Sequence, residues 1–226
     1  MPLPDLTPLF LTLRLATVTT LVLLALGTPL AWWLARTRCR ARPVVEALVA
    51  LPLVLPPTVL GFYLLVALSP QGPVGALVHA LDGPRLAFSF TGLVIGSVIY
   101  SLPFVVQPLQ NAFAGIAPRT LEAAATLGAA PADRFLSIVL PQARTGFLAA
   151  VTLGFAHTVG EFGVVLMIGG NIPGATQVLS IAIYDQVESL QYGTAHLWSA
   201  LLLGFSFAVL LVMYTLRGGQ HAHLGR

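Results

Sequence analysis

Residues 117–128 read Ala117-Pro-Arg-Thr-Leu-Glu-Ala-Ala-Ala-Thr-Leu-Gly128, a polar and alanine-rich stretch in a very apolar chain. Thr120 to Leu127 is predicted to form a short helix, and Gly128 stands where a glycine usually ends one. Alanine side chains let a partner's backbone approach closely, and Glu122 places a negative charge near the helix N-terminus, where such a charge is favourable. We interpret this helix as a compact knob that a socket on another protein can receive.

The stretch continues as Ala129-Ala-Pro-Ala-Asp-Arg-Phe-Leu-Ser-Ile-Val-Leu-Pro141. Pro131 suits the first position of a second short helix, because the missing N–H of proline would have no partner there in any case. Leu140 and Pro141 precede the next apolar run. Residues 117–143 are therefore predicted to form one loop, the longest on its side of the chain.

The composition places this loop in a membrane protein. Of 226 residues, 57% are hydrophobic and 8% are charged, whereas soluble domains carry about 25% charged residues. A membrane-spanning helix needs about 20 apolar residues. The sequence therefore predicts an all-α integral membrane protein with helices at residues 9–35, 45–68, 88–112, 145–167 and 196–216. It predicts one domain over residues 9–216, followed by a short cytoplasmic tail at residues 217–226.

The arginines predict the orientation of the chain. All 11 basic residues are Arg, and nine of them follow the first, third or fifth predicted span. Only Arg14 and Arg85 belong to the other side. Positively charged loops stay in the cytoplasm, so the C-terminus is predicted to be cytoplasmic and the N-terminus to lie outside. The same distribution accounts for the net charge of +3 without nucleic acid as a partner.

The chain lacks the residues for several kinds of chemistry. It contains no Lys, which a phosphate-binding loop of the G-x-x-x-x-G-K-[ST] type requires. If ATP drives this protein, a partner chain must therefore bind the ATP and its Mg. The single Cys39 can form neither an internal disulfide nor a metal site by itself. We predict a protein that is not an enzyme, has no catalytic residues and binds no cofactor or metal.

The second predicted span contains Pro52, Pro56, Pro57 and Gly61. Proline removes a hydrogen-bond donor and clashes with the preceding turn, so this span is predicted to be kinked or broken. A broken backbone at membrane depth is tolerated inside the protein or along a water-filled cavity. Two interpretations stay open, a kink that serves packing alone and a segment that lines a translocation path.

Glu161 is the one acid well inside a predicted span. An intramembrane carboxylate is unfavourable and usually functional, yet it would repel an anion. His157 lies four residues earlier on the same helical face, where the two side chains can pair. We favour a structural or gating role for this pair over direct contact with a substrate.

The loop at residues 117–143 resembles the EAA signature of bacterial ABC importer permeases. The matching pattern is Glu122-Ala-Ala124, three residues, Gly128, nine residues, Ile138, one residue and Leu140-Pro141. In that family the EAA helix docks into a groove on the ATP-binding subunit. The resemblance implies that the residues coupling this chain to the ATPase are Glu122, Ala123, Ala124, Gly128, Ile138, Leu140 and Pro141.

Two further stretches resemble the molybdate branch of these permeases. They are Leu51-Pro-Leu-Val-Leu-Pro-Pro-Thr-Val-Leu-Gly61, and Gly160-Glu-Phe-Gly163 followed by Gly170-Asn-Ile-Pro-Gly174. Sulfate permeases carry similar segments but are usually longer, with an extra N-terminal helix, so five spans favour molybdate. The candidate residues of a translocation path or gate are Pro52, Pro56, Pro57, Gly61, His157, Gly160 and Glu161.

The resemblance implies a multi-pass type I ABC importer permease in the bacterial cytoplasmic (inner) membrane. It implies a homodimer in the lipid bilayer, with the anion path at the dimer interface. Two cytosolic ATP-binding subunits would sit below the dimer, and an external molybdate-binding protein would dock above it. ATP binding would move the knobs around Glu122 and open the helices outward, and hydrolysis would restore the inward-facing state.

Other functions stay open at this point. Within the family, the alternatives are sulfate and tungstate. From another class, the alternative is a secondary transporter driven by an ion gradient, although such folds usually show internal repeats and broken helices in corresponding positions of two halves. This chain has no evident repeat, and only its second span is predicted to be broken. A membrane scaffold that transports nothing is the third alternative.

Overall fold

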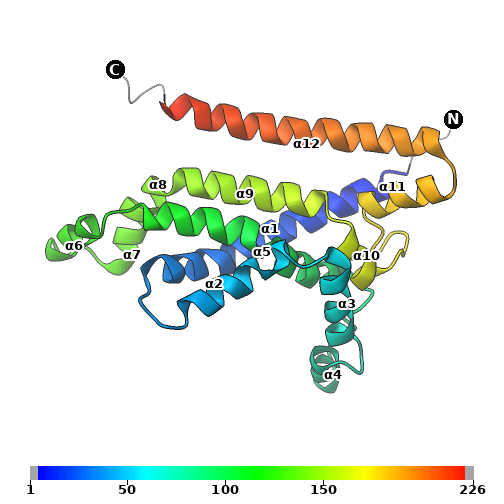
Figure 1. Ribbon diagram of the computed structural model, residues 1–226, viewed down its shortest axis with the longest axis horizontal. Coiled ribbons are helices and arrows are strands. Elements are labelled where there is room, and N and C mark those ends of the chain that lie inside the picture. The colour runs from blue at the N-terminus through cyan, green and yellow to red at the C-terminus, as the bar shows by residue number, and fades with distance from the viewer. Residues whose placement is uncertain (1–4, 222–226) are drawn as a thin grey trace.

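The computed structural model describes residues 5–221, and helices make up most of that range (Figure 1). The α-helices are α1 (Thr7–Arg36), α2 (Arg42–Ala50), α3 (Pro57–Leu68), α4 (Pro73–Ala80), α5 (Phe90–Ala114), α6 (Pro118–Thr126), α7 (Pro131–Arg134), α8 (Leu140–Gln142), α9 (Arg144–Val159), α10 (Gly163–Gly169), α11 (Leu179–Glu188) and α12 (Tyr192–His221). A 3₁₀ turn at Leu51–Leu53 follows α2, and a π-helix at Phe135–Val139 joins α7 to α8. No strand occurs within residues 5–221. The predicted all-α fold is confirmed.

The main core lies between α1, α5 and α9, which pack against one another (Figure 1). Leu34 of α1, Leu109 of α5 and Ala150 of α9 are fully buried there. Val49 of α2 and Val139 of the π-helix belong to the same cluster. The segments that flank the bundle are therefore attached to its apolar core.

Proline begins four of the shorter helices. These helices are α3, α4, α6 and α7, which start at Pro57, Pro73, Pro118 and Pro131. Proline has no N–H to leave unpaired in the first turn, and its fixed φ suits a helix start. The predicted second short helix after Gly128 is confirmed, because α7 begins at Pro131. The longer α5 starts with an N-cap instead, in which Ser89 Oγ accepts a hydrogen bond from the Gly92 N–H at 3.1 Å.

Four stretches of the described chain are long and apolar enough to cross a membrane. They are α1, α3 together with α4, α5, and α12 up to Thr215. A fifth is obtained if Pro131–Gln142 and α9, which meet at a bend of 73°, count as one span. The predicted number of about five spans agrees with these four or five candidates. The orientation of the termini stays a prediction.

The predicted helix at residues 45–68 is wrong as a single span. α2 ends at Ala50 and α3 begins only at Pro57. Pro56 has an extended ψ of 135°, because a following proline disfavours the helical conformation at the residue before it. The predicted break is therefore confirmed, but the apolar span consists of α3 and α4.

The predicted helix at residues 145–167 is also wrong as a continuous span. α9 ends at Val159, and Phe162 has φ −130° and ψ −59°, outside helical values. Ser180 Oγ donates a hydrogen bond to the Glu161 carbonyl at 2.6 Å. This bond gives the carbonyl a partner outside the helix, so the chain can leave the helix without an unpaired polar group. The expectation that only the second predicted span is broken is wrong.

α12 lies beside the bundle and contacts α11 and α9 (Figure 1). Only 11% of its apolar window is buried within one copy of the chain. Its exposed apolar side chains require lipid or another protein around them. The helix is longer than the predicted 196–216, and residues 222–226 of the predicted tail lie outside the described residues.

Candidate functional site

α6 presents the predicted coupling residues at the surface. None of its nine residues is buried. Glu122 and Ala123 are exposed, and Ala124 is half-buried. α6 stands with α7 at one end of the bundle, at the opposite end from α10 and α11 (Figure 1). A surface of small side chains with one acid is suited to docking into a groove on another protein.

Gly128 ends α6 as the sequence predicts. It has φ +86°, in the left-handed region that glycine adopts without strain. The Gly128 N–H donates to the Ala125 carbonyl, and the Ala129 N–H donates to the Ala124 carbonyl, each at 3.0 Å. This pair of hydrogen bonds is the Schellman motif. It fixes the direction in which the chain leaves α6 for α7.

The second half of the loop contains a π-helix that sequence reasoning missed. The Leu140 N–H donates to the Phe135 carbonyl, five residues earlier. Pro141 accounts for the wider turn, because it has no N–H for the carbonyl four residues earlier and its ring collides with that carbonyl in an α-helix. Ile138 is half-buried on the π-helix, whereas Leu140 and Pro141 are exposed. The Leu140-Pro141 pair was the signal in the sequence from which the π-helix could have been predicted.

A cavity of about 550 Å³, here called the break cavity, lies where the break between α9 and α10 meets the start of α3. Its lining residues include Pro57, Thr58, Tyr100, His157, Gly160 and Glu161. Gly163 makes this meeting possible, because a Cβ atom there would lie 2.7 Å from the Cβ of Pro57. The breaks in two separate spans therefore come together at one cavity.

Four of the seven predicted path or gate residues line the break cavity: Pro57, His157, Gly160 and Glu161. The other three lie elsewhere. Pro52 is buried in the 3₁₀ turn, and Pro56 is exposed just before α3. Gly61 packs against α10, where its Cβ would lie 2.8 Å from that of Met167. Gly61 therefore serves the close packing of α3 on α10.

Glu161 is buried in the wall of the break cavity, with 3% of its surface exposed. Within the described residues, neither of its carboxylate oxygens has a hydrogen-bond partner. The predicted pairing with His157 is wrong, because α9 ends at Val159 and the helical spacing of four residues is lost. A buried carboxylate without a partner is strongly unfavourable. This acid is therefore retained for a purpose other than the stability of the isolated chain.

His157 binds α5 instead. Its Nδ1 atom lies 2.9 Å from Ser101 Oγ, which lies 3.1 Å from Thr158 Oγ1. Thr158 Oγ1 donates its own proton to the Gly154 carbonyl, so the proton between the two hydroxyls comes from Ser101. The proton between Ser101 and His157 then comes from Nδ1, and the neutral ring leaves Nε2 as an acceptor. The ring also stacks on Phe104, with centroids 3.9 Å apart.

A second cavity, of about 450 Å³, lies along the halves of α5 and α9 that are nearer the coupling loop. Gln107 and Asn111 of α5 and Thr145 of α9 supply polar groups to its lining. Sequence reasoning missed this cavity. The available signal was that Gln107 and Asn111 lie four residues apart in an uncharged run and therefore share one face of the helix. Within the described chain, Arg lines neither this cavity nor the break cavity.

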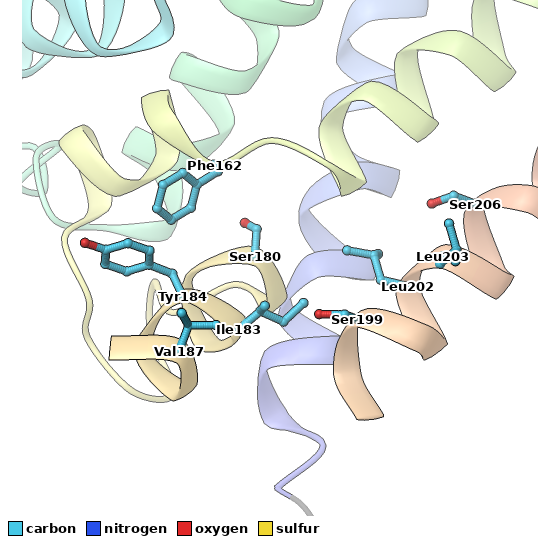
Figure 2. A pocket seen from close by; sticks show the side chains of 9 residues that line it. All are labelled: Phe162, Ser180, Ile183, Tyr184, Val187, Ser199, Leu202, Leu203 and Ser206. Carbon is cyan, nitrogen blue, oxygen red and sulfur yellow. The ribbon is translucent and has the colours of Figure 1, made fainter. Parts of the chain in front are cut away.

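A third cavity, of about 590 Å³, lies between α11 and α12. Figure 2 shows Phe162 and Tyr184 on one side and Ser199 and Leu202 of α12 on the other. Phe162 also borders the break cavity. Apolar side chains supply most of the lining, which suits lipid or helix packing better than an anion.

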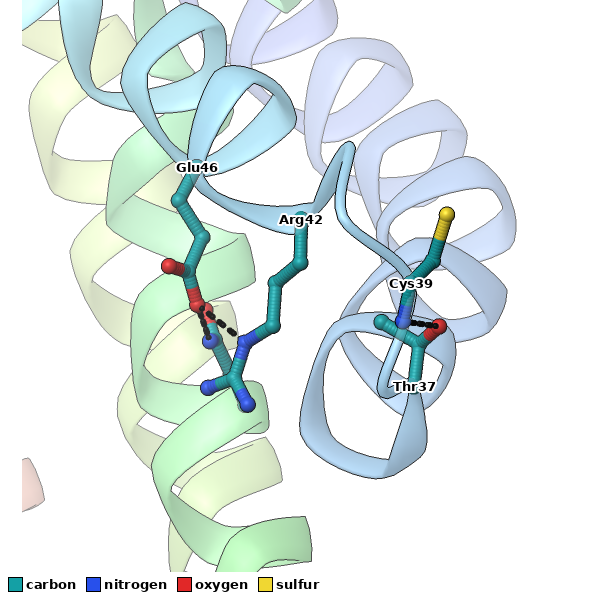
Figure 3. A network of polar contacts seen from close by, with 5 residues as sticks. Thr37, Cys39, Arg42 and Glu46 are labelled. Carbon is teal, nitrogen blue, oxygen red and sulfur yellow. Dashed lines mark hydrogen bonds and ion pairs between the residues drawn. The ribbon is translucent and has the colours of Figure 1, made fainter.

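A polar network joins α2 to α5 (Figure 3). Arg42 Nε donates to Glu46 Oε1 at 3.0 Å, and Gln110 Nε2 donates to the same oxygen at 2.7 Å. The hydrogen bond from Arg42, and then that from Gln110, holds the pKa of Glu46 below its usual range. Cys39, in the turn before α2, has an exposed free thiol.

Comparison with known proteins identifies the family. Residues 27–217 match the family described as binding-protein-dependent transport system inner membrane component. The chain belongs to this family. The permease is 58% identical over 213 residues, 94% of either chain, to the molybdenum transport system permease protein ModB of Azotobacter vinelandii. It is 34% identical over 204 residues to the probable sulfate transport system permease protein cysT of Zygnema circumcarinatum, covering 90% of the permease and 69% of that relative.

A solved structure agrees in fold. The permease is similar to the crystal structure of a bacterial ABC transporter involved in the import of the acidic polysaccharide alginate, with a TM-score of 0.74. The identity is 18%, and the match covers 98% of the permease and 80% of the other chain. The predicted ABC importer permease fold is confirmed. Membership in the family sets aside the secondary transporter and the scaffold.

Proposed function

We propose that this permease is the membrane-spanning subunit of an ATP-driven importer that moves molybdate across the bacterial inner membrane. The observation that carries the proposal is the 58% identity to a molybdenum permease over 94% of both chains. The sulfate relative is 34% identical, so molybdate is favoured over sulfate. Tungstate, a tetrahedral dianion of nearly the same size, stays an alternative substrate.

The proposed coupling element is α6 with its Schellman turn. The exposed Glu122 and Ala123, with the half-buried Ala124, would enter a groove on the ATP-binding subunit. Gly128 would fix the angle of the knob, and Ile138 and the Leu140-Pro141 pair would join it to α9. ATP and Mg would bind to the partner chain, because this chain has no Lys for a phosphate-binding loop.

The proposed anion path passes the break cavity and the second cavity, which both lie along α5 and α9. Hydroxyl and amide groups of Thr58, Tyr100, Gln107 and Asn111 can donate hydrogen bonds to a tetrahedral dianion. Neutral donors hold a dianion less strongly than Arg would, which suits transit rather than storage. Selectivity would then come from an external molybdate-binding protein.

We place this path at the interface of a homodimer. Phe62 and Tyr63 of α3 have 50% and 65% of their surfaces exposed in one copy. A second copy would cover such side chains and close the cavities toward lipid. ATP binding would then draw the two α6 knobs together and open the path outward, and hydrolysis would return it to the inward-facing state.

The test is uptake of labelled molybdate in bacterial cells that lack this gene. Wild-type chain should restore uptake, and Glu122→Arg should abolish it by reversing the charge on the knob. Asp133→Arg, the same charge reversal at an exposed residue of α7, is the matched control and should retain uptake. Excess sulfate should leave wild-type uptake unchanged.

Each other result has a defined meaning. Uptake lost on addition of sulfate would assign the permease to sulfate. Full activity of Glu122→Arg would show that α6 is not the coupling element, even with molybdate as substrate. No uptake with wild-type chain, produced at normal levels together with its partner subunits, would overturn the proposed function.

A further inference from the structure

Arg36 ends α1 at a point where its side chain reaches the end of α5. Its Nη2 atom donates to the Phe113 carbonyl at 3.2 Å and to the Ile116 carbonyl at 3.0 Å. Phe113 lies in the last turn of α5, and Ile116 lies in the short link to α6. Carbonyls at a helix C-terminus lack partners within the helix and carry partial negative charge. A guanidinium group is a strong donor to such carbonyls.

Aromatic rings hold the Arg36 side chain in this position. The guanidinium carbon lies 4.9 Å from the centre of the Trp32 ring, within the range of a cation–π contact. Trp32 meets Phe113 edge-on at 5.3 Å and Phe135 at 5.9 Å between ring centroids. Phe113 also meets Phe147 of α9 at 5.9 Å. The cluster therefore contacts the chain where it enters the coupling loop and where it leaves the loop.

The next two arginines provide a contrast. Arg38 and Arg40 are exposed, and within the described residues neither side chain makes a hydrogen bond or an ion pair. A positive charge that only keeps a loop in the cytoplasm needs no defined partner. Arg36 is half-buried, and its Nε atom is enclosed without a partner in this conformation. Its position is therefore set by the ends of α5 and the coupling loop.

We propose that Arg36 is a positioning residue that transmits the movement of α6 to α1. The proposal rests on the proposed function, in which α6 receives the closing movement of the ATP-binding subunits. Through the covalent chain alone, a displacement of α6 reaches α5, whereas near Arg36 the rest of α1 packs on α5 and α9 through apolar side chains that can slide. With Arg36 bonded to both carbonyls, α1 moves with α5, and the cavities beside α5 change shape with it.

The test uses the complete transporter in liposomes, with its ATP-binding subunits and its binding protein. ATP hydrolysis and uptake of labelled molybdate are measured on the same vesicles. In Arg36→Gln we expect uptake to fall by about tenfold and hydrolysis by less than about twofold, so that the ATP used per molybdate rises. Arg38→Gln makes the same charge change at an exposed neighbour and should keep the wild-type ratio.

Arg36→Lys separates the charge from the planar shape of the guanidinium. A lysine ammonium can donate to a carbonyl but cannot stack as a plane on Trp32, so its ATP-to-molybdate ratio should lie between those of wild type and Arg36→Gln. Should Arg36→Gln fail to assemble, the lysine variant supplies the ratio. A wild-type ratio in the lysine variant would then show that a point charge is sufficient and would overturn the proposal.

Two other results would overturn it as well. One is a wild-type ratio with normal uptake in Arg36→Gln. The other is an equal loss of hydrolysis and uptake in proportion to a lower amount of folded protein, which would make Arg36 a structural residue only. Failure of the proposed function is distinguishable, because the wild-type transporter itself would then show no ATP-dependent uptake of molybdate.

Discussion

The Nδ1 atom of His157 lies 2.9 Å from Oγ of Ser101 and so joins the end of α9 to α5 in the wall of the break cavity. The histidine is therefore occupied by α5 rather than by Glu161. Ser180 secures the chain just after the helix end through the Glu161 carbonyl. The break between α9 and α10 is thus fixed on both sides, and the carboxyl group of Glu161 is left without a partner among the described residues.

The contact through Nδ1 of His157 predicts different effects for substitution by asparagine and by glutamine. Asparagine can place an amide N–H near the position of Nδ1, whereas glutamine extends it toward the position of Nε2. We expect both substitutions to lose the stacking on Phe104, and His157→Asn alone to keep the bond to Ser101. His157→Gln should lose about 1 kcal/mol more of the free energy of unfolding than His157→Asn, measured by denaturation in detergent. A smaller loss for glutamine than for asparagine would show that the Nδ1 position does not carry the stabilising contact with Ser101.

Gly128→Ala isolates the backbone strain at the end of α6. No atom lies within 4 Å of the added Cβ, so the φ of +86° alone opposes the substitution. The left-handed conformation costs an alanine about 1–2 kcal/mol, and we expect binding of the ATP-binding subunit to weaken by about tenfold. Gly128→Asn should weaken it less, because asparagine tolerates this conformation. Gly193→Ala, also in open space, is the control, and an equal effect there would contradict the argument.

Gly154→Ala tests the close approach of α9 to α5. The added Cβ would lie 2.6 Å from Cγ2 of Val105, and such overpacking costs about 1–3 kcal/mol. Val105→Ala in the same chain removes the colliding atom and should restore part of the lost thermal stability. Gly204→Ala in α12 meets open space and should have no effect. If the double substitution does not restore stability, the loss in Gly154→Ala has a cause other than the contact with Val105.

The coupling loop could be predicted because its signals are local. Pro131 at a helix start and Gly128 at a helix end act on hydrogen bonds within a few residues of themselves. The resemblance to a permease family rested on the same stretch, and the family match confirmed it. The π-helix was missed because Leu140-Pro141 was interpreted only as the boundary of the next span.

The break between α9 and α10 could not be predicted from hydropathy. The uncharged run around Glu161 looks continuous, and the break depends on Ser180, which is 19 residues away in sequence. It also depends on the contact of Gly163 with Pro57 of another span. The pairing of His157 with Glu161 failed for the same reason, since it assumed that one helix contains both residues.

Glu46 should make the stability of the permease depend on acidic pH. The hydrogen bonds from Arg42 and Gln110 lower its pKa in the folded chain below its usual value, so the unfolded chain binds the proton more readily. The stabilising contribution is therefore present above the pKa of the unfolded carboxyl, about 4.3, and is lost as pH falls through the folded pKa. We expect the difference in Tm between wild type and Glu46→Gln to be constant near neutral pH and to shrink below about pH 4.3. A difference that grows toward acidic pH would contradict this assignment.

Glu161→Gln tests the acid in the wall of the break cavity. The substitution keeps the shape of the side chain and removes a carboxyl group that has no hydrogen-bond partner within the described residues, so stability should be unchanged or higher by about 1 kcal/mol. Uptake of molybdate should fall by about tenfold, because we assign the acid to gating at the break. The preference for molybdate over sulfate should stay the same, since a residue that gates the break without contacting the anion does not distinguish the two dianions. Asp82→Asn changes an exposed acid outside the cavity and should leave every measurement unchanged. An altered anion preference with normal amounts of folded permease would show instead that Glu161 contacts the anion itself.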